Sequence, residues 1–219
     1  MRLPDARTRA LRVYDILSSV YPNAGPTIRF SNPFELLVAS ILGARATDES
    51  VNRTTDYLFR EYPTPESLSR ADYNRLVERI HDVGLAEPKA RYLIETSRLL
   101  LARHAGEIPC SIEELTDLPG VGRKIANMVL ANACGMPAMI VDTHVNRVSN
   151  RLGLAASTNP AIAERQLKAV LPEDRWTRWN YLMIAHGRSI CTGRNPRHSV
   201  CPVLHLCPTG LSAAGALAA

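Results

Sequence analysis

Residues 118–142 read LPGVGRKIANMVLANACGMPAMIVD, and this stretch decides how the rest of the chain is interpreted. It begins with a Leu-Pro pair and a tight turn, Gly120-Val121-Gly122, between two segments with helical patterns. Glycine permits several backbone N–H groups to point outward together, and the helix that follows adds the positive end of its dipole. The sequence therefore predicts a phosphate-binding turn, and the alternative is a plain corner between two helices.

Two charged residues in this stretch are candidates for chemistry. Lys124 falls in the first turn of the second helix, beside Arg123, where a positive charge is unfavourable and the neutral, nucleophilic amine is favoured. Asp142 follows 18 residues later (142 − 124), just before Thr143, where another helix is expected to begin. An ionised Asp142 can stabilise positive charge at a sugar carbon. The simpler alternatives are a lysine that only holds phosphate and an aspartate that only caps a helix.

Composition bounds the class of protein. The chain has 219 residues, of which 46% are apolar and 5% aromatic, and a formal net charge of +5, which suits a polyanionic partner. No apolar run approaches the ~20 residues of a membrane span. The N-terminal segment is charged and amphipathic, without the apolar core of a signal peptide. We therefore expect a cytoplasmic protein with no membrane partner. Association with the nucleoid and a monomeric state are further expectations.

The five cysteines are unevenly distributed. Cys191, Cys201 and Cys207 lie close together, whereas Cys110 and Cys134 stand alone. An odd number of cysteines in a cytosolic chain argues against a disulfide framework and for metal binding at the C-terminal group. We expect Cys110 and Cys134 to be small buried residues.

Helical patterns with capping residues predict an all-α fold. Asn32-Pro33, Asp48, Asp72 and Asn159-Pro160 each mark the expected start of a helix. No run alternates convincingly with a period of two, so no sheet is expected.

The segment LPGVGRKIANMVLANACGMPAMIVDTHVNRVSNRLG resembles the endonuclease III family of DNA glycosylase/AP lyases, in the helix-hairpin-helix superfamily. The similarity extends from about Phe34 to Cys207. The resemblance implies that the hairpin, residues 120–123, binds DNA, that Lys124 is the Schiff-base nucleophile, and that Asp142 is the essential carboxylate. By the same resemblance, His144 lines the pocket.

The resemblance also implies two helical lobes. One is a six-helix barrel with the hairpin, residues 26–137. The other is a discontinuous domain with an iron–sulfur cluster, residues 1–25 plus 138–219.

Two further segments resemble family segments that support base eversion. In ILGARATD, Ile41 to Asp48, Arg45 replaces a glutamine that fills the gap left by the flipped nucleotide, and Gly43 replaces a serine. Arginine can stack and donate several hydrogen bonds, so we expect gap filling to persist. In HDVGLAEPKA, residues 81–90, Leu85 is the intercalating residue, and an ordinary core leucine is the alternative. Asp48, at the end of the ILGARATD segment, is also expected to be a DNA-binding residue.

The C-terminal group departs from the family pattern C-x6-C-x2-C-x5-C, because the chain has Cys191, His198, Cys201 and Cys207 at those positions. Three interpretations remain open. A [4Fe–4S] cluster has His198 at one iron; a zinc ion occupies a Cys3His site; or the cluster is three-iron or absent and His198 is a surface residue.

The expected activity is bifunctional excision of oxidised pyrimidines from double-stranded DNA, followed by β-elimination at the abasic site. The alternatives are a monofunctional mismatch glycosylase and a non-catalytic helix-hairpin-helix DNA-binding protein.

Overall fold

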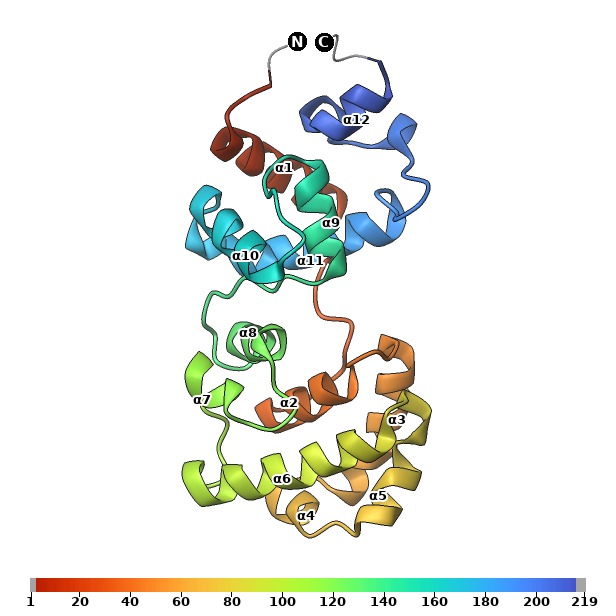
Figure 1. Ribbon diagram of the computed structural model, residues 1–219, viewed down its shortest axis with the longest axis vertical. Coiled ribbons are helices and arrows are strands. Elements are labelled where there is room, and N and C mark those ends of the chain that lie inside the picture. The colour runs from red at the N-terminus through yellow and green to blue at the C-terminus, as the bar shows by residue number, and fades with distance from the viewer. Residues whose placement is uncertain (1–2, 216–219) are drawn as a thin grey trace. The chain divides into compact units, whose positions relative to one another are not determined.

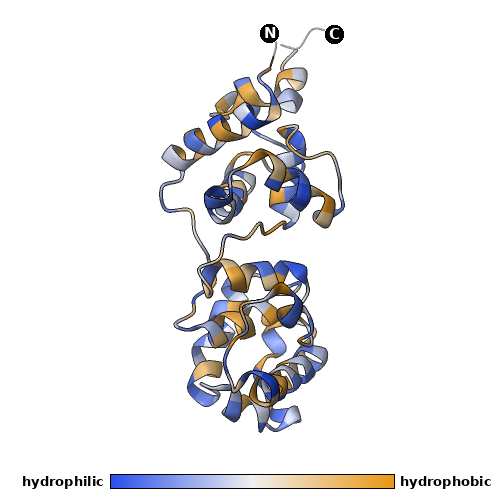
Figure 2. Cartoon of the chain, turned by 90° about the vertical axis from the view of Figure 1, so that its left-hand side faces the viewer, coloured by the Kyte–Doolittle hydropathy of each residue, from blue (hydrophilic) through white to orange (hydrophobic). Residues whose placement is uncertain are grey.

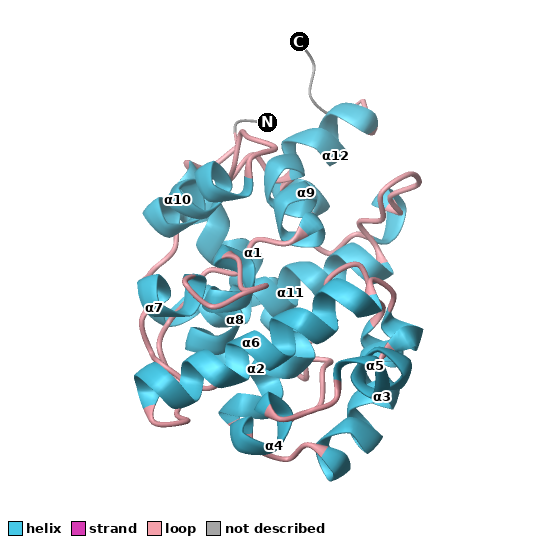
Figure 3. Ribbon diagram, turned by 60° about the horizontal axis from the view of Figure 1, so that its bottom comes forward, coloured by secondary structure: helices cyan, strands magenta, loops and turns pink. Residues whose placement is uncertain are grey.

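The computed structural model describes residues 3–215 and confirms the all-α prediction. Within these residues, helices are joined by loops and no strand occurs (Figure 3). The chain divides into two compact units, one formed by Pro26–Met136 and the other by Met1–Gly25 together with Pro137–Ala219. In the described part of the chain, no helix is long and apolar enough to cross a membrane.

The unit Pro26–Met136 is built around two helices, one almost entirely buried and one that buries a single face. In α2 (Pro33–Leu42), every residue from Leu36 to Leu42 is buried, and α6 (Ala86–His104) contacts α2 as well as the short helices beside it (Figure 1). The remaining helices of the unit are α3 (Asp48–Glu61), α4 (Pro65–Ser69), α5 (Tyr73–Arg79), η1 (His81–Val83), α7 (Ile112–Thr116) and α8 (Arg123–Asn132).

The second unit surrounds Trp179, whose side chain is fully buried in a cluster of apolar residues. Trp179 belongs to α11 (Trp176–Ser189), which contacts α1 (Ala6–Val20) and α9 (Thr143–Arg151). The other elements are α10 (Pro160–Val170), η2 (Glu173–Arg175), η3 (His198–Val200), η4 (Leu204–Leu206) and α12 (Pro208–Ala213). Hydrophobic and hydrophilic residues alternate around most helices of both units, as expected for helices that bury one face (Figure 2).

Most predicted helix starts are confirmed by capping hydrogen bonds. Asn32 accepts a hydrogen bond from the Glu35 N–H, with Pro33 at the first helical position, as the sequence predicts. The prediction that Asp48 caps α3 is wrong by one residue. Thr47 is the cap, because its hydroxyl accepts from the Ser50 N–H at 3.2 Å, and Asp48 is the first helical residue.

Cys110 and Cys134 form a disulfide, so the expectation that they are isolated buried residues is wrong. Cys110 is exposed and Cys134 is half-buried, and both lie in loops. Cys110 immediately precedes Ser111, the cap of α7, and Cys134 follows the end of α8. The bond therefore closes a loop that contains both helices of the hairpin and the turn between them.

Candidate functional site

The turn between α7 and α8 is anchored to its own unit. The Val121 N–H donates to the Leu118 carbonyl at 3.1 Å, and the Thr96 hydroxyl of α6 donates to the Pro119 carbonyl at 3.0 Å. Val121 itself is buried. These contacts fix the shape of the turn before any ligand binds, which a rigid binding site requires.

The two glycines of the turn serve different purposes. Gly120 has a φ of 77°, and a Cβ atom there would lie 2.8 Å from Cδ2 of Tyr92, so both backbone conformation and packing require glycine. Gly122 has a φ of −92°, and a Cβ atom there would meet nothing within 4 Å. The fold therefore needs Gly120, whereas the absent side chain of Gly122 only leaves the surface open to a ligand.

The N-terminus of α8 offers backbone donors to an anion. Gly122 is the cap and supplies no side-chain hydrogen bond, while Arg123 and Lys124 are exposed in the first turn. The first N–H groups of a helix have no partner within the helix, and they carry the positive end of the dipole. This arrangement can bind a phosphate through the backbone.

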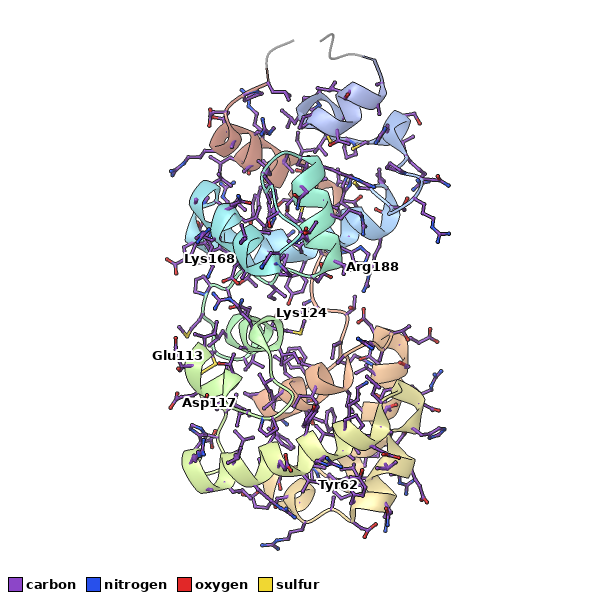
Figure 4. The ribbon with its side chains drawn as sticks, in the orientation of Figure 1. Tyr62, Glu113, Asp117, Lys124, Lys168 and Arg188 are labelled. Carbon is purple, nitrogen blue, oxygen red and sulfur yellow. A yellow bond between two sulfur atoms is a disulfide. The ribbon has the colours of Figure 1, made fainter. Side chains whose placement is uncertain are left out.

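The sequence contains three lysines, Lys89, Lys124 and Lys168, and their surroundings differ sharply. Lys89 is 2% exposed. Lys168 forms an ion pair with Glu164 at 2.9 Å and lies over the ring of Trp176. Lys124 is exposed on α8 (Figure 4). Of the three amines, that of Lys124 is best placed to meet a large substrate.

A cavity of about 240 Å³ lies beside Lys124, within the unit Pro26–Met136. It brings together Lys124, Gly122 and Asp48, three of the residues singled out from the sequence. Its lining consists of Ile28, Ser40, Gly43, Ala44, Asp48, Gly122, Lys124, Ile125 and Met128. The Asp48 carboxylate accepts a hydrogen bond from the Thr27 hydroxyl at 2.7 Å. The wall of this cavity therefore offers an amine, a fixed carboxylate and apolar surface.

Arg45 and Leu85 both occupy left-handed backbone conformations that side chains rarely adopt. Their φ angles are 56° and 53°, and within residues 3–215 the only other non-glycine residue with a positive φ is Ala105. Leu85 is 52% exposed, so the interpretation of this residue as an ordinary core leucine is wrong. Arg45 is also exposed. Strained, exposed residues of this kind are typical of functional sites.

Asp142 caps α9 in the second unit, as the sequence predicts. Its Oδ1 accepts a hydrogen bond from the Val145 N–H at 2.7 Å. The side chain is half-buried rather than enclosed. The hydrogen bond uses one carboxylate oxygen and fixes the orientation of the group.

His144 lies two residues further along, in the first turn of α9. Its Nδ1 is 3.2 Å from Nη2 of Arg147, and because a guanidinium only donates, Nδ1 is the acceptor in a hydrogen bond between them. Burial lowers the pKa of His144, the charges of Arg147 and Arg188 act in the same direction, and Asp142 opposes them. His144 is therefore a neutral imidazole at pH 7, and if Nδ1 accepts from Arg147, the proton lies on Nε2.

Arg147 is a site residue that sequence reasoning missed. Its guanidinium donates to the carbonyls of Gly187 and Cys191, at 3.0 and 3.2 Å for Nη2. A Cβ atom at Gly187 would lie 3.0 Å from both Arg147 Nη2 and His144 Nδ1. Arg147 thus joins the helix that carries Asp142 to the first cysteine of the C-terminal group.

The four expected cluster ligands line one cavity of the second unit, namely Cys191, His198, Cys201 and Cys207. Arg151 Nη1 donates to Cys191 Sγ at 3.3 Å, and the Gly210 N–H donates to Cys207 Sγ at 3.3 Å. Burial raises the pKa of the Cys201 and Cys207 thiols. Metal binding would have to offset this rise, since a metal binds the thiolate.

The chemistry of these four side chains is suited to a metal centre. A single zinc ion draws its ligands to within about 2.0–2.3 Å of one point. An iron–sulfur cluster binds its ligands at separate irons, and the three cysteines and His198 that line one cavity offer four such ligands. The residues present fit a cluster.

His186 is a second residue of this site that the sequence did not reveal. It is fully buried, and burial lowers its pKa to about 4, so the imidazole is neutral. Its Nε2 lies 3.6 Å from Cys201 Sγ, and its Nδ1 lies 3.2 Å from the Tyr21 hydroxyl, which is also bonded to Ser189. If Tyr21 donates to Nδ1, the proton on Nε2 points toward the cysteine sulfur.

The chain is similar to known proteins over most of its length. Residues 38–173 match the HhH-GPD superfamily of base excision DNA repair proteins, and residues 191–207 match the iron–sulfur binding domain of endonuclease III. The chain is 40% identical over 209 residues to endonuclease III of Synechocystis sp., covering 95% of each protein. It is 39% identical over 197 residues to that of Bacillus subtilis, covering 90% of each.

A solved structure of a trapped covalent intermediate between endonuclease III and DNA has the same fold. It superimposes with a TM-score of 0.90 at 37% sequence identity, over 95% of this chain and 98% of that one. The chain therefore belongs to the endonuclease III family of the HhH-GPD superfamily, and it is a base excision repair DNA glycosylase and AP lyase with an iron–sulfur cluster.

Proposed function

We propose that Lys124 is the nucleophile of a bifunctional reaction on oxidised pyrimidines in double-stranded DNA, and that Asp142 is its partner carboxylate. The observation that carries this assignment is the contrast among the three lysines: Lys89 is buried, Lys168 is paired, and Lys124 is exposed at a cavity. The similarity to a trapped endonuclease III–DNA covalent intermediate supports a covalent route.

The hairpin holds the DNA in this proposal. Its backbone N–H groups and Arg123 bind phosphates without reading sequence, while Leu85 enters a kinked base step and Arg45 fills the space left by the everted nucleotide. The exposure of both side chains supports this role. The cavity beside Lys124 supports it further, because it offers room for part of the everted nucleotide.

The chemistry begins with the neutral amine of Lys124. Its lone pair forms a bond to C1′ while the bond from C1′ to the base breaks, and the base leaves with the electron pair and gains a proton. Loss of the amine proton and opening of the sugar ring give the Schiff base. Removal of a proton from C2′ then expels the 3′ phosphate and cleaves the strand.

Asp142 stabilises the positive charge that develops on the sugar as the base departs. Its role as the cap of α9 supports this, because the hydrogen bond from the Val145 N–H fixes the orientation of the carboxylate. His144, neutral and with its Nε2 proton available, lines the pocket and donates to the substrate.

The C-terminal residues hold a [4Fe–4S] cluster through Cys191, Cys201 and Cys207, with His198 as the fourth ligand. When bound, the cluster supplies a structural centre that orders the loops around it and takes no part in breaking the glycosidic bond. Arg147 and Arg151 link α9 to the Cys191 end of this site. The unit containing it, residues 1–25 with 138–219, acts as the cluster domain, and the protein works as a monomer.

The test is reductive trapping on duplexes that carry a panel of oxidised pyrimidines or an abasic site. Borohydride should give a covalent protein–DNA adduct with the unmodified protein and with the matched control Lys168→Ala, and none with Lys124→Ala. Asp142→Asn keeps a capping side chain and should lower base release by about a hundredfold or more, as loss of an electrostatic stabiliser does. Trapping by Lys124→Ala at the normal level contradicts the assignment, and excision of a mismatched normal base with no adduct supports a monofunctional enzyme.

A further inference from the structure

We propose that Lys89 is a positioning residue for base eversion, because its buried amine ties together the turn that carries Arg45 and the turn that carries Leu85. This inference rests on the DNA-probing role proposed above for those two residues. It concerns a residue that does not line the cavity beside Lys124.

Lys89 lies in the first turn of α6 and is 2% exposed. Its Nζ donates to the Leu42 carbonyl at 2.8 Å and to the Val83 carbonyl at 2.8 Å. Burial lowers the pKa of Lys89. Burying an amine costs free energy unless its hydrogen bonds are made. The two hydrogen bonds of Lys89 offset that cost.

The two carbonyls belong to the ends of two helical segments. Leu42 is the last residue of α2 and Val83 is the last residue of η1. The final carbonyls of a helix lack partners within the helix and carry the negative end of its dipole. One ammonium therefore satisfies two helix ends at once and fixes the distance between them.

Each of the two carbonyls that bind Lys89 belongs to a residue just before a strained turn. Three residues after Leu42 comes Arg45, in a turn closed by a hydrogen bond from the Ala46 N–H to the Gly43 carbonyl at 3.2 Å. Two residues after Val83 comes Leu85, which follows Gly84 and is the cap of α6. The φ angles at Arg45 and Leu85, 56° and 53°, need support from the surroundings to persist.

The Leu85 turn is held from the main chain as well. The backbone N–H of Lys89 donates to the Leu85 carbonyl at 3.1 Å. Lys89 thus holds the Leu85 turn through its backbone N–H, and it holds the Leu42 and Val83 carbonyls through Nζ. The consequence is that Arg45 and Leu85 are presented to DNA as a pair with a fixed spacing, which insertion beside a single everted nucleotide demands.

The experiment replaces Lys89 with Met, which fills similar space but leaves both carbonyls unpaired. We expect excision of an oxidised pyrimidine from a duplex to fall by roughly tenfold to a hundredfold, as misplacement of positioning groups does. Cleavage of an abasic site in single-stranded DNA needs no eversion and should stay within about twofold of the original rate. The fluorescence of 2-aminopurine placed beside the lesion, which reports unstacking, should rise less than with the unmodified protein.

A double-mutant cycle separates positioning from general destabilisation. If Lys89 acts through the probing residues, Lys89→Met should cost far less duplex excision in a Leu85→Ala, Arg45→Ala background than in the original protein. Fully additive losses, an unchanged duplex rate, or equal loss of single-strand cleavage overturn the proposal. Should Lys89→Met fail to fold, Lys89→Gln undergoes the same measurements, and a duplex rate equal to that of the unmodified protein is the contrary result.

Failure of the underlying function looks different. If Leu85→Ala and Arg45→Ala leave duplex excision unchanged while Lys124→Ala abolishes trapping, the catalytic role of Lys124 is correct. The DNA-probing role of Arg45 and Leu85 is then wrong. If Lys124→Ala still traps, the catalytic assignment itself fails. Neither pattern resembles the additive losses that contradict the role of Lys89 alone.

Discussion

Arg45 and Leu85 lie 40 residues apart in the sequence and share the same left-handed backbone conformation, with φ angles of 56° and 53°. A left-handed conformation costs a side chain about 1–2 kcal/mol. Both side chains are exposed, so no core packing offsets that cost. Backbone strain that no packing offsets indicates that these two residues serve a function.

Replacing either residue with glycine should separate stability from activity. Arg45→Gly and Leu85→Gly should leave the free energy of unfolding unchanged or raise it by up to about 1 kcal/mol, because glycine accepts a positive φ. Both should lower excision from duplex DNA. Ala105→Gly, at a φ of 52° on the end of α6, is the matched control and should keep full activity. Loss of stability in the first two variants contradicts this account.

The two glycines of the hairpin should respond in opposite ways to substitution by alanine. Gly120→Ala should lower the free energy of unfolding by about 2–4 kcal/mol, because of its positive φ and the Tyr92 ring at 2.8 Å. Gly122→Ala should cost about 1 kcal/mol or less, since its Cβ meets open space, yet weaken DNA binding.

Chemical denaturation and DNA titration at a fixed salt concentration measure the two effects. In a Tyr92→Ala background, Gly120→Ala should retain only the backbone part of its cost, about 1 kcal/mol. An unchanged affinity for DNA in Gly122→Ala argues that the backbone of the turn does not approach a phosphate.

The disulfide between Cys110 and Cys134 should stabilise the hairpin unit. Its 24-residue separation corresponds to about 3 kcal/mol of lost entropy in the unfolded chain. The melting temperature of the protein should therefore fall when a reductant is added. Cys134→Ser should melt at the lower temperature with or without reductant, which separates this bond from the cluster cysteines. Equal melting temperatures for oxidised and reduced protein contradict the prediction.

His198 should contribute to retention of the cluster. His198→Ala should lower the iron and sulfide content of protein purified without oxygen, whereas His198→Cys should restore or raise it, because a thiolate is the stronger ligand for iron. Metal analysis with electron paramagnetic resonance measures the outcome. A preparation that contains zinc and no iron, or equal iron in all three proteins, excludes His198 as a ligand.

Much of this architecture could be predicted from local patterns. The caps at Asn32 and Asp142, the glycines of the hairpin and the spacing of the C-terminal ligands each depend on a few neighbouring residues, which the sequence displays directly. The shift of the α3 cap from Asp48 to Thr47 reflects the same locality, since both residue types cap helices and only the backbone decides between them.

What the sequence could not show depends on tertiary contacts. Cys110 and Cys134 form a disulfide because two loops lie side by side, and the spacing of the cysteines in the sequence does not predict this pairing. Lys89 sits in a helical pattern like any solvated lysine, and only the ends of α2 and η1, 47 and 6 residues away, reveal its role. His186 likewise lies in a helical pattern that does not distinguish it, and its role depends on its contacts with Cys201 and Tyr21.

The most direct test of the central claim is to identify the amine that bonds to DNA. The unmodified protein is reacted with duplex DNA containing an abasic site, reduced with borohydride and digested, and the DNA-linked peptide is sequenced by mass spectrometry. The account predicts that the sugar remnant is attached to Lys124. Attachment at Lys89, at Lys168 or at the amino terminus, or the absence of any adduct, would contradict it.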